Sequence, residues 1–197
     1  MHIQDKIRAE IEDVFHGREE LDYDKLMGMP YLDMVVKETL RFQSPVTSTV
    51  RTASRDDVIP LSKSYASRYG NETFDKVIVR KGQDIIIPIQ QINRLESIWG
   101  PTADKFEPER WSQVPRAAKA SGMPAQMLSF LQGPRGCIGR TFALVESKVL
   151  ICALLRVLKF ESAGWEVEAT QAIVSQPRVV GQEELGTQMP IRISKLY

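Results

Sequence analysis

The sequence predicts a mainly α-helical protein with small β-sheets, and three observations point to this fold class. Two segments near the start of the chain, residues 2–15 and 30–44, repeat apolar side chains at helical spacing. Residues 140–160 show the same periodicity with few polar interruptions, which predicts a largely buried helix. The stretches that favour extended structure are only a few residues long. The 197 residues suffice for one domain with a core, and they are also compatible with two small ones.

The first helix is expected from about His2 to Phe15, with its end near Gly17. The apolar residues that share one face of it are Ile3, Ile7, Ile11, Val14 and Phe15. No capping segment precedes them, so the chain starts like a helix from the middle of a domain. Charged residues interrupt the apolar positions, which excludes a secretory signal peptide. A polar loop is expected to follow.

The second helix is expected to begin at Pro30 and to end before Pro45. Its apolar arc consists of Leu32, Val35, Val36, Thr39 and Leu40. Glu38 and Arg41 lie together on another side, three residues apart. Considered alone, they predict an exposed ion pair that stabilises the helix by about 0.2–0.5 kcal/mol.

The middle and the end of the chain alternate between short strands and loops. Residues 46–51 are rich in β-branched side chains, and residues 77–89 predict two strands that turn near Lys81–Gly82. Loops are expected at 61–75 and 112–125. Two prolines argue against a long regular element in 99–111, where three aromatic side chains offer anchors for packing. Short strands are expected within 167–175 and 189–196.

Composition excludes some classes of protein. The formal net charge of +1 gives no electrostatic basis for binding nucleic acid. The two cysteines allow at most one disulfide and indicate a reducing compartment. The longest apolar run, residues 149–155, is stopped by Arg156 and falls short of the roughly 18 residues of a spanning helix. We therefore expect no membrane anchor within this chain.

Cys137 stands in the stretch FLQGPRGCIG, residues 130–139, among glycines and close to an arginine. A cysteine that only fills a core behaves as a small hydrophobe and needs neither neighbour. Because Cys137 lies just before the helix expected at 140–160, the helix dipole and nearby amide groups favour its thiolate. A thiolate in this setting is suited to holding a bulky metal cofactor.

The neighbours of the cysteine support the same interpretation. Gly136 and Gly139 have no side chains, so a flat ligand can approach the backbone closely. Gly133 allows the chain to turn, and Arg135 offers a cation to an anionic group such as a carboxylated cofactor. Phe130 can cover the sulfur and exclude water, which tunes a metal–thiolate bond.

Zinc is the alternative metal. Two cysteines and two histidines would supply the right number of ligands, but Cys137 and Cys152 lack the short spacing that such sites use. His2 and His16 are remote in sequence and are expected at the surface of the first helix. Cys152 lies between apolar residues of the later helix and is expected to pack in the core.

The pattern F-x-x-G-x-R-x-C-x-G resembles the haem-binding signature of the cytochrome P-450 monooxygenases. All of its fixed positions are occupied here, by Phe130, Gly133, Arg135, Cys137 and Gly139. The resemblance implies that haem (iron protoporphyrin IX) binds through the Cys137 thiolate and that these five residues form the cofactor-binding loop. It further implies that residues 1–197 are a single partial domain, the C-terminal part of the cytochrome P-450 fold without its distal oxygen-activating helix.

Two further motifs resemble the same family. In E-T-L-R, Glu38 and Arg41 match the family's E-x-x-R pair, and the P-E-R-W segment supplies Arg110 as their partner. This trio would hold the proximal scaffold and would take no part in the chemistry. The family also places a basic residue, which meets a haem propionate, in the strand after this helix. Arg51 stands at about that position, and Arg55 is the competing candidate.

The resemblance is greatest to fungal microsomal members and implies a monooxygenase. It implies electrons from NADPH through a reductase, a small organic substrate, and a whole protein at the cytosolic face of the endoplasmic reticulum membrane. The family's distal motif, A/G-G-x-D/E-T, does not occur here, so we identify no catalytic residue and expect an upstream part of the same protein to supply the oxygen-activating groups. Lys148 and Arg140 are expected as solvated surface charges, with docking of the electron donor as the alternative. The competing functions are a truncated, non-catalytic haem-binding relic and an interaction domain without a cofactor.

Overall fold

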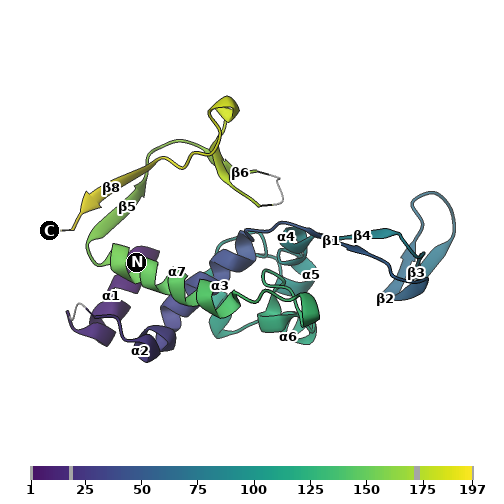
Figure 1. The fold of residues 1–197 in the computed structure, drawn as a ribbon, viewed down its shortest axis with the longest axis horizontal. Helices are drawn as coiled ribbons and strands as arrows, with labels where there is room; N and C mark the ends of the chain where they lie inside the picture. The colour runs from purple at the N-terminus through teal and green to yellow at the C-terminus, as the bar shows by residue number, and fades with distance from the viewer. Residues whose placement is uncertain (1, 18–19, 171–173, 197) are drawn as a thin grey trace. The chain divides into compact units, whose positions relative to one another are not determined.

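In a computed structural model of the chain, residues 2–17, 20–170 and 174–196 are described. The chain divides into two compact units, and Figure 1 traces both. The first unit joins Met1–Thr47 to Ile89–Tyr197, and the second is Ser48–Pro88. The predicted class, helices with small sheets, is confirmed. That the whole chain is one partial domain stays a prediction.

Four helices form the main part of the first unit. They are α1 (Ile3–Phe15), α2 (Tyr23–Gly28), α3 (Pro30–Phe42) and α7 (Arg140–Leu155), and α7 packs on the other three. The helix α1 has its predicted bounds, because His2 caps its first turn and the N–H of His16, at φ 50°, donates to the Glu12 carbonyl. A polar loop is predicted after α1, and the prediction is wrong for Tyr23–Gly28, because these residues form α2. The Asp22 carboxylate caps that short helix by accepting from the Lys25 N–H.

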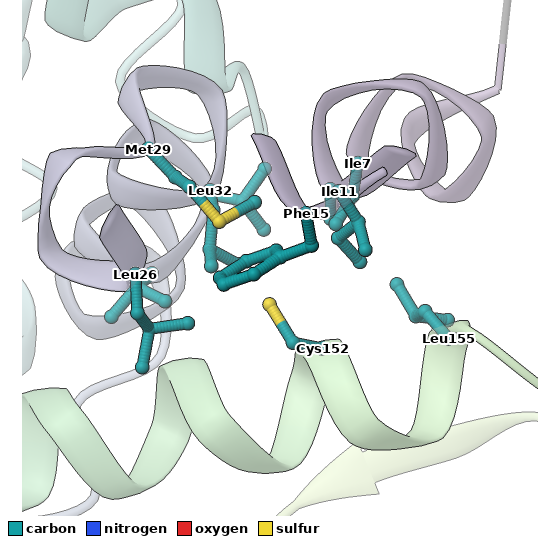
Figure 2. Packing of buried hydrophobic residues seen from close by; sticks show 10 residues of the cluster. Ile7, Ile11, Phe15, Leu26, Met29, Leu32, Cys152 and Leu155 are labelled. Atoms are coloured by element: carbon teal, nitrogen blue, oxygen red, sulfur yellow. The ribbon is translucent and has the colours of Figure 1, made fainter. Parts of the chain in front are cut away.

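The core of this unit lies between these four helices. Its buried members are Ile7, Ile11, Phe15, Leu26, Met29, Leu32, Val35, Val36, Cys152 and Leu155. In Figure 2 the Cys152 side chain points from α7 toward the Phe15 ring, as expected for a cysteine that packs in a core. Burial raises the pKa of the Cys152 thiol to about 11.

The helix α7 differs from its prediction in length and in burial. It ends at Leu155, and the strand β5 (Leu158–Ser162) takes up the rest of the periodic stretch. Only one face of α7 is buried, because α1, α2 and α3 all pack against that side. Phe142, Leu150 and Leu154 are exposed, so the expectation of a largely buried helix is wrong.

The segment between α3 and α7 folds into short helical turns. These are α4 (Ile89–Ile92), α5 (Glu96–Trp99), α6 (Arg116–Ala120) and the 3-10 turns η1 (Pro108–Ser112), η2 (Pro124–Gln126) and η3 (Gly133–Arg135). The Trp99 and Trp111 rings anchor this segment, with their centroids 5.2 Å apart. The helix α6 shows that the loop predicted at 112–125 is partly helical.

The C-terminal strands form two antiparallel pairs. The strand β5 pairs with β8 (Ile191–Lys195), and β6 (Val167–Ala169) pairs with β7 (Pro177–Val179). A 3-10 turn, η4 (Glu183–Leu185), lies between β7 and β8. Strands were expected within 167–175 and 189–196, and both expectations are confirmed for the described residues. Residues 171–173 of the first stretch lie outside them.

The second unit consists of two antiparallel strand pairs. β1 (Thr49–Thr52) pairs with β4 (Asp84–Ile87), and β2 (Asp57–Ala66) pairs with β3 (Thr73–Val79). The loop prediction for residues 61–75 is therefore wrong, because most of that stretch belongs to the β2–β3 hairpin. The predicted turn near Lys81–Gly82 is present, but β3 and β4 on either side of it pair with different strands.

Within the described ranges, no helix combines the length and the apolar character needed to cross a bilayer.

Candidate cofactor site

The backbone around Cys137 forms a tight, closed loop. The Cys137 N–H donates to the Phe130 carbonyl at 2.8 Å, and the Gly136 N–H donates to the Gly133 carbonyl at 2.9 Å. Gly133 has φ 70°, a conformation that glycine adopts without strain, and Leu131 also has a positive φ. A Cβ on Gly136 would lie 3.2 Å from the Gly133 carbonyl oxygen. Glycine at 136 thus lets the loop close on itself.

The loop presents the cysteine at the surface. Cys137 is exposed, between η3 and the first turn of α7. Its sulfur lies 3.9 Å from the position that a Cβ on Gly139 would take, so a side chain at 139 would stand in van der Waals contact with the sulfur. Ile138 is fully exposed and Phe142 is 70% exposed, although both are strongly apolar. A soft sulfur donor flanked by exposed apolar side chains has the chemistry that could hold a flat, apolar macrocycle with a central iron.

Two other predicted loop residues are placed by the structure. Phe130 is half-buried, and the guanidinium carbon of Arg140 lies 6.0 Å from the centre of its ring. Arg140 is only partly exposed, so it is not the freely solvated charge that the sequence predicts. Arg135 is exposed in η3.

Glu38, Arg41 and Arg110 meet in a buried network. Glu38 and Arg41 are 0% exposed, so the exposed ion pair predicted from their spacing alone is not what forms. Arg41 donates to both carboxylate oxygens of Glu38, at 2.8 and 2.9 Å. Nε of Arg110 donates to Oε1 of Glu38 at 3.0 Å, and Nε1 of Trp111 donates to Oε2 at the same distance. The network joins α3 to η1.

The donors around Glu38 determine its ionisation. Burial acts to raise the pKa of this carboxyl group, but hydrogen bonds from Arg41, the Glu107 N–H and Arg110 outweigh it. The pKa of Glu38 therefore lies below its ordinary value. The carboxylate stays charged and paired, which suits a fixed scaffold.

Lys148 contradicts its predicted role as a solvated charge. It is fully buried on α7, where its Nζ lies 3.0 Å from the Asp33 carboxylate of α3 and donates to the Met27 carbonyl. Burial acts to raise the pKa of Asp33, but Lys37 and Lys148 together lower it below its ordinary value. Lys148 thus ties the helix that follows Cys137 to the helix that carries Glu38.

The two candidates for a propionate contact both belong to the second unit. Arg51 lies on β1, and its Nη1 donates to Oγ1 of Thr49 and to the Val50 carbonyl. Arg55 is strongly exposed, 3.7 Å from the Asp57 carboxylate. The choice between Arg51 and Arg55 stays a prediction.

The ligands of the alternative zinc site do not come together. Across residues 2–17, 20–170 and 174–196, no three histidine, cysteine, aspartate or glutamate side chains gather as a metal site would require. Cys152 is buried in the core, whereas Cys137 is exposed. His2 and His16 are exposed at the two ends of α1.

Comparison with known proteins agrees with this geometry. The family profile "Cytochrome P450" matches residues 1–180, so the chain belongs to the cytochrome P-450 family. Cytochrome P-450 monooxygenase 205 of Postia placenta is 42% identical over 99% of the chain. Cytochrome P-450 monooxygenase claO of Ampulloclitocybe clavipes is 35% identical over 98%. The predicted family and the similarity to fungal members are confirmed.

The same comparisons define how much of the family's fold is present. The chain spans about 36% of the length of both fungal relatives. The crystal structure of a mutant haem domain of cytochrome P-450DA superposes with a TM-score of 0.73 at 23% sequence identity. The superposition covers 98% of this chain and 37% of the haem-domain chain. The structure is therefore a partial cytochrome P-450 fold, as predicted.

Proposed function

We propose that this chain is the haem-binding C-terminal portion of a cytochrome P-450 monooxygenase, in which the Cys137 thiolate would hold the haem iron. The observation that carries the proposal is the exposed Cys137 thiol, held in a closed glycine loop directly before α7 and flanked by exposed apolar side chains. Membership of the family supports the assignment of haem as the cofactor.

Each residue of the loop would have a distinct task. The N–H of Cys137 is already engaged by the Phe130 carbonyl, which fixes the backbone from which the sulfur projects. Gly139 leaves the space over the sulfur open, and Ile138 and Phe142 would lose water when they cover the macrocycle. Phe130 would shield the sulfur from its own side.

Charged residues would hold the edge of the cofactor. Arg135 would pair with a haem propionate. For Arg51, with Arg55 as its competitor, the same role rests on the family resemblance alone. Glu38, Arg41 and Arg110 would keep the proximal scaffold rigid. A thiolate-bound haem supplies the activation of O₂ that lets the family insert one oxygen atom into an organic substrate.

Proton delivery, substrate binding and electron supply would come from outside this chain. An upstream part of the same protein would provide the distal acid and threonine that deliver protons, and with them the binding site for a small organic substrate. An NADPH-dependent reductase would supply electrons. For the whole protein we propose the cytosolic face of the endoplasmic reticulum membrane.

The test uses the whole protein with its upstream part, reduced and exposed to carbon monoxide. We expect the red-shifted Soret band of a thiolate-bound haem, and its loss in Cys137→Ala. Cys152→Ala is the matched control, because it makes the same change at the buried cysteine and should keep the band. An unaltered band in Cys137→Ala would rule out the ligand assignment, and failure of the parent protein to bind haem would rule out the function.

A further inference from the structure

We propose that Asn93 is a positioning residue that couples the buried Glu38–Arg41–Arg110 network to the loop that presents Cys137. The inference rests on the proposed function, because it assigns a task to the loop only if Cys137 binds iron. It adds a residue that lies outside both the cysteine motif and the charged trio.

The Asn93 side chain is fully buried, and all of its polar atoms are engaged. Its Oδ1 accepts from the Leu128 N–H at 2.8 Å. Its Nδ2 donates to Oγ of Ser44 at 2.9 Å and to Oγ of Ser129 at 3.0 Å. A buried amide is costly unless it is hydrogen-bonded, so this complete set of partners fixes both the position and the orientation of the group.

The backbone of the same residue reaches the charged network. The Asn93 carbonyl accepts a hydrogen bond from Nη1 of Arg41 at 2.9 Å. The Nε and Nη2 atoms of that guanidinium bind the Glu38 carboxylate. Any shift of Arg41 is therefore transmitted directly to the backbone that carries the Asn93 amide.

On its other side, Asn93 contacts the start of the cysteine loop. Leu128 and Ser129, which both bond to its amide, directly precede Phe130, whose carbonyl accepts from the Cys137 N–H. The Ser129 hydroxyl also donates to the Leu40 carbonyl of α3 at 2.7 Å. An unbroken series of hydrogen bonds and peptide links thus runs from Glu38 to the backbone of Cys137.

The geometry favours a specific role for asparagine over general core filling. An apolar side chain of similar size would leave the partly buried Leu128 N–H without its acceptor. An aspartate would keep the acceptor but would lose both donors and bring an unpaired charge into the core. Both serine hydroxyls donate to the Leu40 carbonyl, so the amide matches its site by supplying two donors to these hydroxyls and one acceptor to the Leu128 N–H.

The test measures the carbon monoxide spectrum of the reduced, haem-loaded whole protein for Asn93→Leu, Ser129→Ala and the double variant. The control is Leu26→Ala, which opens a cavity in the core between the helices without touching residues 128–137. Each variant is compared with the control at a denaturant concentration that gives equal global stability. The ratio of the thiolate-type band to the unshifted band then reports the position of the sulfur rather than overall unfolding.

We expect Asn93→Leu to lower that ratio roughly ten-fold relative to Leu26→Ala, because the partly buried Leu128 N–H loses its acceptor beside the loop. Ser129→Ala, which removes a single hydroxyl and leaves the core packed, should lower it less. The double variant should lower the ratio by less than the product of the two single effects, because both substitutions remove the Asn93–Ser129 hydrogen bond.

Three other results would be decisive. Equal ratios in Asn93→Leu and Leu26→Ala would overturn the inference and leave the proposed function intact. If Asn93→Leu does not accumulate, an unchanged ratio in Ser129→Ala would overturn it equally. Absence of the thiolate band in the parent protein would instead refute the proposed function.

Discussion

Replacing Glu38 with glutamine tests the buried charge network. Its carboxylate accepts from Arg41 twice, from Arg110, from Trp111 and from the Glu107 N–H. Glutamine would keep one of the two acceptor oxygens. In place of the other oxygen it would put an NH₂ group, which would face the N–H donors that this oxygen accepts from.

The loss of stability expected for Glu38→Gln follows from the burial of its two arginine partners. Arg41 is 0% and Arg110 only 7% exposed, so neither guanidinium can regain its hydration when the counter-charge at Glu38 is removed. Arg110 keeps the Glu107 carboxylate at 3.1 Å, so the stranded charge is that of Arg41. Stranding a buried charge in this way costs about 3–5 kcal/mol. We expect Glu38→Gln to lower the free energy of unfolding by that amount.

The assay is urea unfolding of the whole protein, followed by the fluorescence of Trp99 and Trp111, which lie in or beside the network. The control is Glu161→Gln, whose carboxylate pairs with Lys159 at the surface and whose loss should leave stability unchanged. If Glu38→Gln lowered the free energy of unfolding by less than about 1 kcal/mol, the range typical of exposed ion pairs, the reasoning would be refuted.

The pH dependence of this difference provides a second check. Because the pKa of Glu38 is lower in the folded than in the unfolded state, its contribution is complete above the unfolded pKa of about 4.3. The contribution is lost as pH falls through the folded pKa. The stability difference between the parent protein and Glu38→Gln should therefore be constant near neutral pH and should narrow in acid. A difference that widens in acid would contradict the sign.

Three other predictions concern contacts that the structure defines. Glu10→Ala should lower the free energy of unfolding in urea by about 1 kcal/mol, because this carboxylate of α1 accepts from the first two free N–H groups of α3. An unchanged free energy of unfolding would exclude the capping role. Lys148→Met should raise the pKa of Asp33, measured by carboxyl NMR titration, and an unchanged pKa would show that the ion pair is absent. In haem-free protein a thiol reagent should modify Cys137 and spare Cys152 until unfolding, because Cys152 is buried with a pKa of about 11. Labelling of Cys152 in the native state, detected by mass spectrometry, would contradict the packing of the core.

The long helices could be predicted because their sequences carry the pattern of their packing. The apolar spacing of α1 and the prolines that flank α3 determine elements that agree with the structure almost to the residue. The six-residue helix α2 is too short to show periodicity, and it depends on one buried side chain, Leu26, and a cap from Asp22. The β2–β3 hairpin is almost entirely exposed, so no alternation of apolar and polar residues marks it.

The candidate site also has a part that the sequence predicts and a part that only the structure reveals. The residues of the cysteine loop are contiguous, so the order of amino acids alone is enough to identify its motif. Trp111, Lys148 and Asn93 acquire their roles only where distant segments meet, and each resembles an ordinary aromatic, charged or polar residue in the sequence. Lys148 in particular follows the pattern of a surface lysine, and its burial becomes intelligible only beside Asp33 of α3.

The central claim, a bond between Cys137 sulfur and haem iron, is tested most directly by X-ray absorption at the iron edge of the haem-loaded whole protein. A sulfur atom in the first coordination shell, replaced by nitrogen or oxygen in Cys137→Ala, is the predicted result. A shell of nitrogen and oxygen atoms alone in the parent protein would contradict the account.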